Sequence, residues 1–309
     1  MNPSRESQTS ENGAPARSAP HLPGSRWYDR RVNAAPAKQP IWIDVPGGRL
    51  AAEDEGDGPP ILLVHSAIVN RRAWDPVVPY LTEAGYRAIR YDMRGFGEST
   101  TEDVEYGPHE DMVAVLDHFG VGRAAVVGNS MGASFSLEAV LESPERFVAF
   151  VWVGGGISGF ARDRAPHEQL LFKAESDAEE AGDMDLAAEL DTQIWVDGIG
   201  QPSTRVAPDV RAAIKAMDRE LLNPGRVFGD DKRPEPSLGR LGDVAVPTLA
   251  VVGDLDTTDT RTAAERLAAD VPDARLVRLP DVAHIIGMEA PDRLAALIVE
   301  HLAPLPRWS

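Results

Sequence analysis

The chain has 309 residues, of which 43% are hydrophobic and 26% charged, enough for one large α/β domain or for two smaller domains. Its net charge of −18 disfavours nucleic acid and anionic membranes as partners, because phosphate groups are bound through clustered lysine and arginine. The sequence has no cysteine, which excludes disulfides, thiolate nucleophiles and cysteine-ligated metal sites.

Residues 1–39 are rich in Pro, Ser, Ala, Asn and Arg and show no apolar periodicity, so we predict a disordered N-terminal tail. This segment has no apolar core of a secretory signal. No hydrophobic run in the chain reaches the roughly 18 residues that a membrane span needs. We therefore expect a cytoplasmic protein without a membrane partner, and no feature indicates an oligomeric state.

Strand patterns alternate with helical patterns from Ile41 onward. Two short runs around a Pro-Gly-Gly turn predict an opening antiparallel hairpin, Ile41–Val45 and Arg49–Glu53. Continuous apolar runs later in the chain are typical of strands buried on both faces of a parallel sheet. The predicted strands are Pro60–Val64, Arg87–Tyr91, Ala124–Val127 and Phe147–Val153, and the predicted helices are Arg72–Leu81, Pro108–Phe119 and Ser130–Leu141.

The alternation stops at Ile157. Residues 157–240 show mainly helical patterns and no convincing strand, with helices predicted at Gln169–Ala181, Leu186–Val196 and Val210–Leu222. Eight carboxylates lie between Glu175 and Asp191 with no basic residue among them, which indicates a solvated helical face rather than a metal site.

Strand and helix patterns then resume, at Pro247–Gly253, Arg261–Ala269, Arg275–Leu279 and Pro291–Leu302. This regular alternation predicts βαβ units in a mostly parallel sheet. We predict a helical cap, residues 157–240, inserted into a core made of residues 40–156 and 241–309.

Ser130 is the candidate nucleophile. It is the centre of Gly128-Asn129-Ser130-Met131-Gly132, a Gly-x-Ser-x-Gly pentapeptide between a predicted strand and a predicted helix. On such a turn the hydroxyl projects from the sheet edge, and the glycines leave room for the backbone angles and for the helix. A serine hydroxyl also needs a base and a group that orients the base.

Candidates for these two roles should follow strands downstream of Ser130, because sites in open parallel sheets form beyond the carboxyl ends of the strands. Asp254 and Asp256 follow the strand that ends at Gly253, and His284 follows the strand that ends near Leu279. The chain order Ser, Asp, His is the order found on a nucleophile elbow. A buried structural histidine is the alternative interpretation of His284.

With these residues the chain resembles the α/β-hydrolase superfamily over about residues 41–302. The matching motifs are the His65-Ser66 strand end, Asp92-x-Arg94-Gly95-x-Gly97-x-Ser99, the Ser130 pentapeptide, Gly253-x-x-Asp256, and His284 with Glu289 and Pro291 downstream. The resemblance implies an α/β-hydrolase fold: a mostly parallel, eight-stranded sheet flanked by helices, with an inserted helical cap. Length and cap are similar to those of the enol-lactonase and C–C hydrolase branches.

The resemblance also implies roles for particular residues. The family places its catalytic acid three residues after the strand-end glycine, which favours Asp256 over Asp254. Two backbone N–H groups are expected to form the oxyanion hole, at Met131 and at Ala67 in the loop after His65.

Ser66 replaces the glycine of the family's usual His-Gly dipeptide, and its side chain either restricts this loop or places a hydroxyl near the pocket. His65 is expected to shape the loop, and the Asp92–Ser99 motif is expected to be structural, with Arg94 tying loops beneath the site. In the cap, Trp195 either lines the substrate pocket or packs the cap against the core.

We therefore expect a serine hydrolase that cleaves a small carboxylic ester or lactone through an acyl-enzyme, with no metal and no cofactor. Ser130 attacks, His284 acts as base and then as acid, and Asp256 orients it. The serine argues against dehalogenases and epoxide hydrolases, whose nucleophile is an aspartate. C–C bond hydrolases, thioesterases, amidases and cofactor-free perhydrolases share the triad and remain alternatives, as does a non-hydrolytic small-molecule receptor.

Overall fold

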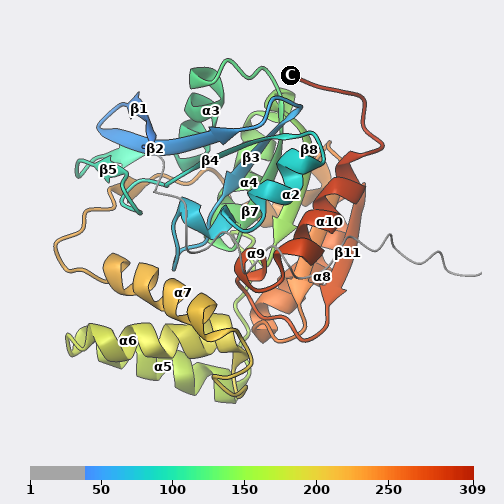
Figure 1. Ribbon diagram of the computed structural model, residues 1–309. Coiled ribbons are helices and arrows are strands. Elements are labelled where there is room, and N and C mark those ends of the chain that lie inside the picture. Colours follow the sequence, from blue (N-terminus) through green and yellow to red (C-terminus); the bar gives the residue numbers. More distant parts are fainter. Residues whose placement is uncertain (1–38) are drawn as a thin grey trace, which may run out of the picture. The chain divides into compact units, whose positions relative to one another are not determined.

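The computed structural model describes residues 39–309, so the predicted disordered tail lies outside the described residues except for its last position (Figure 1). Among residues 39–309, eight strands form one sheet in the order β1-β2-β4-β3-β7-β8-β10-β11, and the short β5 pairs with β2 as a ninth. Their bounds are β1 Ile41–Val45, β2 Gly48–Glu55, β3 Pro60–Val64, β4 Arg87–Tyr91, β5 Thr100–Thr101, β7 Ala124–Asn129, β8 Phe147–Val153, β10 Thr248–Gly253 and β11 Ala274–Leu279.

The strands from β4 to β11 in this order pair in parallel, whereas β1 and β2 are antiparallel to their neighbours. The predicted α/β-hydrolase fold with its mostly parallel, eight-stranded sheet is thus confirmed, with β5 as a short addition. Parallel order brings the carboxyl ends of β3, β7, β8 and β10 to one edge, which is where a site is expected to form.

Helices cover both faces of the sheet, because alternate residues of a strand point to opposite sides. In β3, Leu62 and Val64 belong to a core cluster shared with α3, α4 and α8. Ile61 and Leu63 of the same strand belong to a second cluster, shared with α2 and α10. The helices flanking the sheet are η1 Arg71–Trp74, α2 Val78–Glu83, α3 Pro108–His118, α4 Met131–Glu142, η2 Pro144–Arg146, α8 Thr258–Asp270, α9 Ile286–Glu289 and α10 Pro291–Leu302.

One predicted helix is wrong as a continuous element. The segment 72–81 is divided into the 3₁₀ helix η1 and the separate helix α2. The two prolines explain the break, since Pro76 has no N–H to continue the first helix and Pro79 occupies the first turn of the second.

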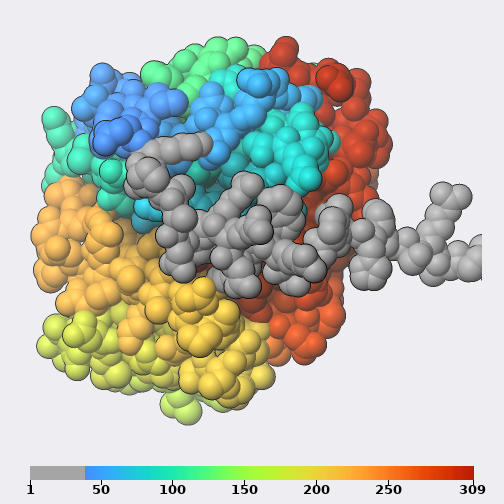
Figure 2. Space-filling view, viewed as in Figure 1, coloured from blue at the N-terminus to red at the C-terminus, as the bar shows by residue number. Residues whose placement is uncertain are grey.

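The segment between β8 and β10 is mainly helical, and we call its helices α5, α6, η3 and α7 the cap. Their atoms, yellow-green to gold, pack directly against those of the sheet region (Figure 2). The expectation of no strand here is wrong for two residues, because β9 pairs with β6 of the sheet region. Bounds are α5 Pro166–Glu180, α6 Met184–Asp191, η3 Thr192–Gly198, α7 Pro208–Leu221, η4 Ser237–Asp243, β9 Asp230–Asp231 and β6 Glu105–Tyr106.

The cap also departs from the sequence prediction in two details. The helix predicted to continue to Val196 changes at Thr192 from an α-helix to the π-helix η3. The acidic run is not a uniformly solvated face, since Asp191 is only 8% exposed whereas the side chain of Asp185 is 85% exposed. Asp191 turns inward because the indole Nε1 of Trp195 donates a hydrogen bond to it.

Candidate active site

Ser130 lies on the turn between β7 and α4 with backbone angles φ 57° and ψ −117°. This conformation is costly for a non-glycine residue and persists only where the surroundings enforce it. The Ser130 N–H donates to the carbonyl of Val153 at 2.8 Å, which ties the turn to the adjacent strand β8. A Cβ on Gly128 would lie 2.4 Å from the carbonyl oxygen of Gly132, and one on Gly132 would lie 2.5 Å from that of Val64. The two glycines are therefore a steric requirement of the turn.

His284 and Asp256 form a buried hydrogen-bonded pair. Nδ1 of His284 lies 2.8 Å from Oδ2 of Asp256, and the two residues are 3% and 4% exposed. The other carboxylate oxygen of Asp256 accepts the N–H of Thr257 at 2.7 Å, which fixes the orientation of the carboxylate. Because Nδ1 faces the carboxylate, it carries the proton, and Nε2 is left as the basic nitrogen.

The other candidate acid, Asp254, contacts a different partner. Its Oδ1 accepts a hydrogen bond from Nε of Arg278 at 2.7 Å, and both side chains are more than a third exposed. Of the two aspartates that follow β10, only Asp256 is therefore hydrogen-bonded to His284.

Asn129 connects the serine turn to the histidine loop. Its buried amide nitrogen donates to the carbonyls of Val153 at 3.0 Å and His284 at 3.3 Å. Sequence reasoning did not select this residue, although it occupies a variable position of the Gly-x-Ser-x-Gly pentapeptide. The contact explains how β7 and the loop after β11 keep a common geometry.

Met131 and Ala67 are the two residues expected to form the oxyanion hole. Met131 is the first residue of α4 and is half-buried, whereas Ala67 is exposed in the loop after β3. Within residues 39–309, neither backbone N–H has a hydrogen-bond acceptor. Both amides are thus free, in this part of the chain, to bind an oxygen atom of a ligand.

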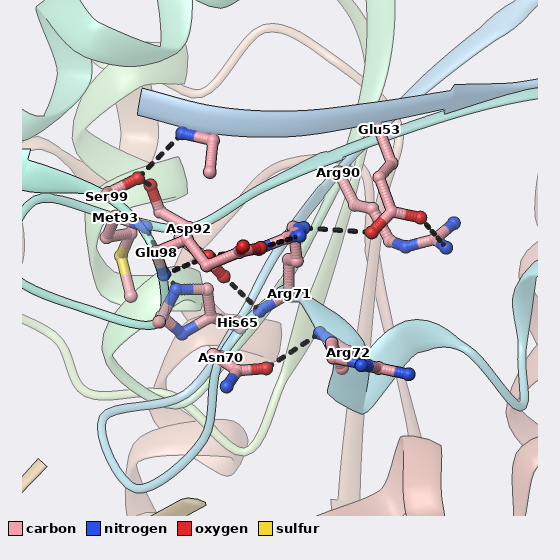
Figure 3. Close-up of polar contacts among 12 residues, drawn as sticks. Glu53, His65, Asn70, Arg71, Arg72, Arg90, Asp92, Met93, Glu98 and Ser99 are labelled. Carbon is pink, nitrogen blue, oxygen red and sulfur yellow. Dashed lines mark hydrogen bonds and ion pairs between the residues drawn. The ribbon is translucent and has the colours of Figure 1, made fainter. Parts of the chain in front are cut away.

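His65 is held by both ring nitrogens in the loop after β3 (Figure 3). Its Nδ1 donates to the carbonyl of Ser66 at 2.8 Å, and its Nε2 accepts the N–H of Met93 at 3.0 Å. Complete burial lowers the pKa of His65 to about 4, so the ring is neutral near neutral pH. This arrangement agrees with the expected role of His65 in shaping the loop.

A buried charge network supports the same loop (Figure 3). Asp92 accepts the backbone N–H of Arg71 at 2.7 Å and that of Glu98 at 2.9 Å. The guanidinium of Arg71 forms ion pairs with Glu53, Asp92 and Glu98. Arg94, from the same motif as Asp92, forms a two-pronged pair with Asp111 and donates to the carbonyl of Pro46. These residues hold backbone segments together.

Ser66 is only 2% exposed. It borders a small, partly open hollow that His65, Asn129 and Ile285 also line. Its predicted role in substrate binding stays a prediction.

Trp195 of the cap lies directly beside His284. The two ring centroids are 4.5 Å apart, and the Trp195 carbonyl accepts the backbone N–H of His284 at 3.2 Å. The Trp195 indole is oriented by Asp191 at 3.0 Å and by an edge contact with Phe172, 5.3 Å between centroids. Trp195 therefore contacts the candidate base, and at the same time it packs the cap against the sheet region.

The segment between β8 and β10 also contacts the first turn of α8, which directly follows the loop that carries Asp256. Oε1 of Glu168 accepts both the backbone N–H and the hydroxyl of Thr258, each at 2.9 Å. Arg164 forms an ion pair with Asp259 at 3.1 Å. Sequence reasoning missed these contacts, because nothing local to Glu168 identifies a partner 90 positions away.

No cluster of three or more metal-ligating side chains occurs within residues 39–309. None of the helices in this range has the length and apolar character that crossing a membrane requires.

A family model described as "Alpha/beta hydrolase family" matches residues 61–297, well over half of the chain. The chain belongs to the alpha/beta hydrolase family. Among curated relatives, a protein named haloalkane dehalogenase 2, from Mycobacterium tuberculosis, is 28% identical over 84% of this chain and 93% of the relative. A rhodomycin D methylesterase from a Streptomyces species is also 28% identical, over 78% of this chain and 90% of its own.

Solved structures share the fold. A thermophilic esterase from Thermogutta terrifontis has 26% identity and a TM-score of 0.69, and the match covers 86% of the present chain and 99% of the esterase. An enol-lactonase from Burkholderia xenovorans shares the fold with a TM-score of 0.68 at 21% identity, over 85% and 100% of the two chains. The names of these similar proteins differ in activity, from a dehalogenase to esterases and an enol-lactonase.

Proposed function

We propose that this alpha/beta hydrolase is a serine hydrolase that cleaves a small carboxylic ester or lactone through an acyl-enzyme intermediate. The main support is the buried pair of His284 and Asp256, joined at 2.8 Å, in a loop that Asn129 connects to the strained Ser130 turn. The pair supplies the base and its orienting carboxylate, and the turn supplies the nucleophile.

In the proposed reaction, Oγ of Ser130 attacks the ester carbonyl carbon and its proton passes to Nε2 of His284. The resulting imidazolium is stabilised by Asp256, to which Nδ1 donates. The tetrahedral oxyanion accepts hydrogen bonds from the N–H groups of Met131 and Ala67, and such a donor contributes about 3–4 kcal/mol in comparable enzymes. His284 then gives its proton to the leaving alkoxide as the ester C–O bond breaks. Water attacks the acyl-enzyme and gives a proton to His284, which passes a proton to Oγ of Ser130 as the acyl–Oγ bond breaks and the acid leaves.

A serine at the nucleophile position favours ester over haloalkane chemistry. A carboxylate that displaces a halide forms an ester, which water can hydrolyse to regenerate the enzyme. A serine that displaced a halide would form an alkyl ether, which has no carbonyl for water to attack. Ser130 therefore supports acyl transfer rather than dehalogenation, despite the likeness to a protein named as a dehalogenase.

Two relatives support an ester substrate. The methylesterase and the thermophilic esterase are, by their names, ester hydrolases, and each is more than 25% identical over most of this chain. A lactone is an internal ester, so the same steps open it and leave the alcohol attached to the acyl group.

The test compares wild type, Ser130→Ala and Ser134→Ala on p-nitrophenyl acetate and on a panel of esters, lactones, thioesters and vinylogous diketones. Ser134 is the matched control, because it lies one turn along α4 and its hydroxyl donates to the Gly156 carbonyl instead. Loss of the nucleophile should lower kcat by about 10⁴-fold or more, whereas Ser134→Ala should stay within about threefold of wild type. Retention of more than a few per cent of activity by Ser130→Ala contradicts the proposal.

A further inference from the structure

Arg205 joins the cap to the loop that carries His284. It lies between η3 and α7, and its guanidinium donates to two cap carbonyls, that of Asp197 at 2.6 Å and that of Val196 at 2.5 Å. The same guanidinium donates to the carbonyl of Asp281, in the histidine loop, at 2.8 Å. One side chain thus holds backbone groups of both segments.

Glu289 completes this junction. Its carboxylate forms an ion pair with Arg205, and its Oε2 also accepts the backbone N–H of Ala283 at 2.9 Å. Ala283 directly precedes His284 in the chain. The side chains of Arg205 and Glu289 are only 14% and 11% exposed, so solvent screens their pair less than a surface pair.

The two cap carbonyls held by Arg205 directly follow Trp195. Trp195 in turn accepts the backbone N–H of His284 and contacts the imidazole ring. His284 is therefore constrained from the cap on one side, through Trp195, and from Ala283 on the other, through Glu289. Arg205 is the side chain common to both constraints.

We propose that Arg205, paired with Glu289, is a positioning residue through which the cap sets the place of the His284 imidazole. This inference rests on the proposed serine hydrolase function and assigns Arg205 no contact with substrate.

The shape of the guanidinium matters for this role. Arginine offers five N–H donors in a planar fork, whereas lysine presents a single ammonium. Removal of Arg205 leaves three carbonyls and one carboxylate without this donor in a largely buried place, which favours rearrangement of the loop. The loop is already constrained, since Asp281 has a positive φ of 62°.

A purely structural role makes a different prediction. If Arg205 only holds the cap over the pocket, its loss should raise KM, most for bulky substrates that reach the cap. If it places the imidazole, its loss should lower kcat even for p-nitrophenyl acetate, whose acyl group is small. A displacement of about 1 Å in a reacting group costs on the order of 100-fold in rate.

The variants are Arg205→Met, Arg205→Lys, Glu289→Gln and the control Arg211→Met. Arg211 is an equally buried cap arginine, with a side chain 16% exposed, whose ion pairs to Glu189 and Asp197 stay within the cap. On p-nitrophenyl acetate we expect Arg205→Met to lower kcat about 10- to 100-fold with KM within about twofold of wild type. The kcat of Arg205→Lys should exceed that of Arg205→Met by less than about threefold, because one ammonium cannot reach the separate acceptors. Arg211→Met should keep kcat.

Hydrogen exchange supplies a readout that does not depend on catalysis. The His284 amide is protected by its bond to Trp195, so peptides covering residues 280–290 should exchange faster in Arg205→Met than in Arg211→Met. If Arg205→Met fails to fold, Glu289→Gln carries the same test, since its amide oxygen can still accept the Ala283 N–H.

The outcomes separate the two proposals. If wild type shows no Ser130-dependent turnover, the proposed function is wrong. If hydrogen exchange over residues 280–290 is unchanged in Arg205→Met, Arg205 does not hold the histidine loop, whatever the activity. If turnover depends on Ser130 but Arg205→Met keeps its kcat, or changes only KM, the positioning role is wrong. A lower kcat shared equally by Arg211→Met also overturns it, because the effect would then come from the cap in general.

Discussion

At the scale of single residues, the site depends on backbone positions that only glycine can occupy. Ser130 adopts φ 57° because Gly128 and Gly132 let α4 approach β3 and β7 without a clash. The same two glycines thus allow both the backbone angles of Ser130 and the close packing of α4 on the sheet. Gly154, which follows β8 and has a φ of 54°, likewise leaves room for the acid–base pair of Asp256 and His284.

Gly154→Ala should impair catalysis, because alanine adds a Cβ beside the acid–base pair and is strained at this positive φ. The added Cβ would lie 3.1 Å from Oδ2 of Asp256 and 3.3 Å from Nδ1 of His284, so the pair must shift by a few tenths of an ångström. We expect kcat on p-nitrophenyl acetate to fall by about 10-fold or more, because small displacements of reacting groups are costly. Gly156→Ala is the matched control, since its Cβ would meet only Ser134 Oγ at an ordinary 3.7 Å. Equal activity of the two variants would contradict this account of Gly154.

The candidate triad could be proposed from sequence because each residue carries a local signal. Ser130 lies in a recognisable pentapeptide, and Asp256 and His284 follow predicted strands. Asn129, Glu168 and Arg205 carry no such signal, because their partners lie 155, 90 and 84 positions away along the chain. Their roles depend on the folded path of the cap and the loops, which spacing does not encode.

At the scale of elements, the cap buries carboxylates where its helices meet. Asp218 of α7 is 3% exposed, and its Oδ2 has no hydrogen-bond partner within residues 39–309. Burial, with the nearby charges of Asp191, Glu179 and Glu175, raises the pKa of Asp218 to about 8. Burial likewise raises the pKa of Glu175 to about 7 and that of Asp191 to about 6. The cap therefore retains protons near neutral pH that an unfolded chain would release.

Asp218→Asn should stabilise the protein in a pH-dependent way. The folded-state pKa is raised, so wild type loses stability as pH rises from the ordinary value near 4 to about 8. The asparagine variant has no carboxyl group to ionise at this buried position. Its Tm should therefore exceed that of wild type by several degrees at pH 9 and by much less at pH 5. For a chain of this size, about 1 kcal/mol corresponds to roughly 2–4 °C.

The control for this prediction is Asp177→Asn, because the Asp177 carboxylate is 59% exposed on the adjacent helix α5. Thermal unfolding followed by circular dichroism between pH 5 and 9 measures the difference. A Tm difference for Asp218→Asn that stays constant with pH would show that Asp218 is ionised throughout in the folded protein.

Element prediction succeeded where one physical signal dominated. β3, β4, β8 and α10 begin and end at the predicted residues, because their apolar patterns end at clear breaks. The prediction of one helix over residues 72–81 was wrong because it followed the apolar spacing and disregarded the two prolines. The π-helix η3 could not be predicted, since its widened turn depends on contacts with the histidine loop as well as on local preference.

At the scale of the whole molecule, the cap is bonded to both loops of the candidate acid–base pair. Glu168 holds the start of α8, two residues after Asp256, and Trp195 and Arg205 hold the loop around His284. Substitutions in the cap should therefore affect the chemical step as well as substrate selection. This expectation distinguishes the molecule from one in which the cap is only a cover.

The central claim is that Ser130 is a nucleophile activated by His284 and Asp256. The most direct measurement is labelling of the full chain with a fluorophosphonate, followed by mass spectrometry to locate the adduct. The account predicts one adduct per chain, on Ser130, in wild type, and labelling slower by at least about 100-fold in His284→Ala, because the serine then lacks its base. An unlabelled Ser130 in wild type, or equal labelling in His284→Ala, would contradict it.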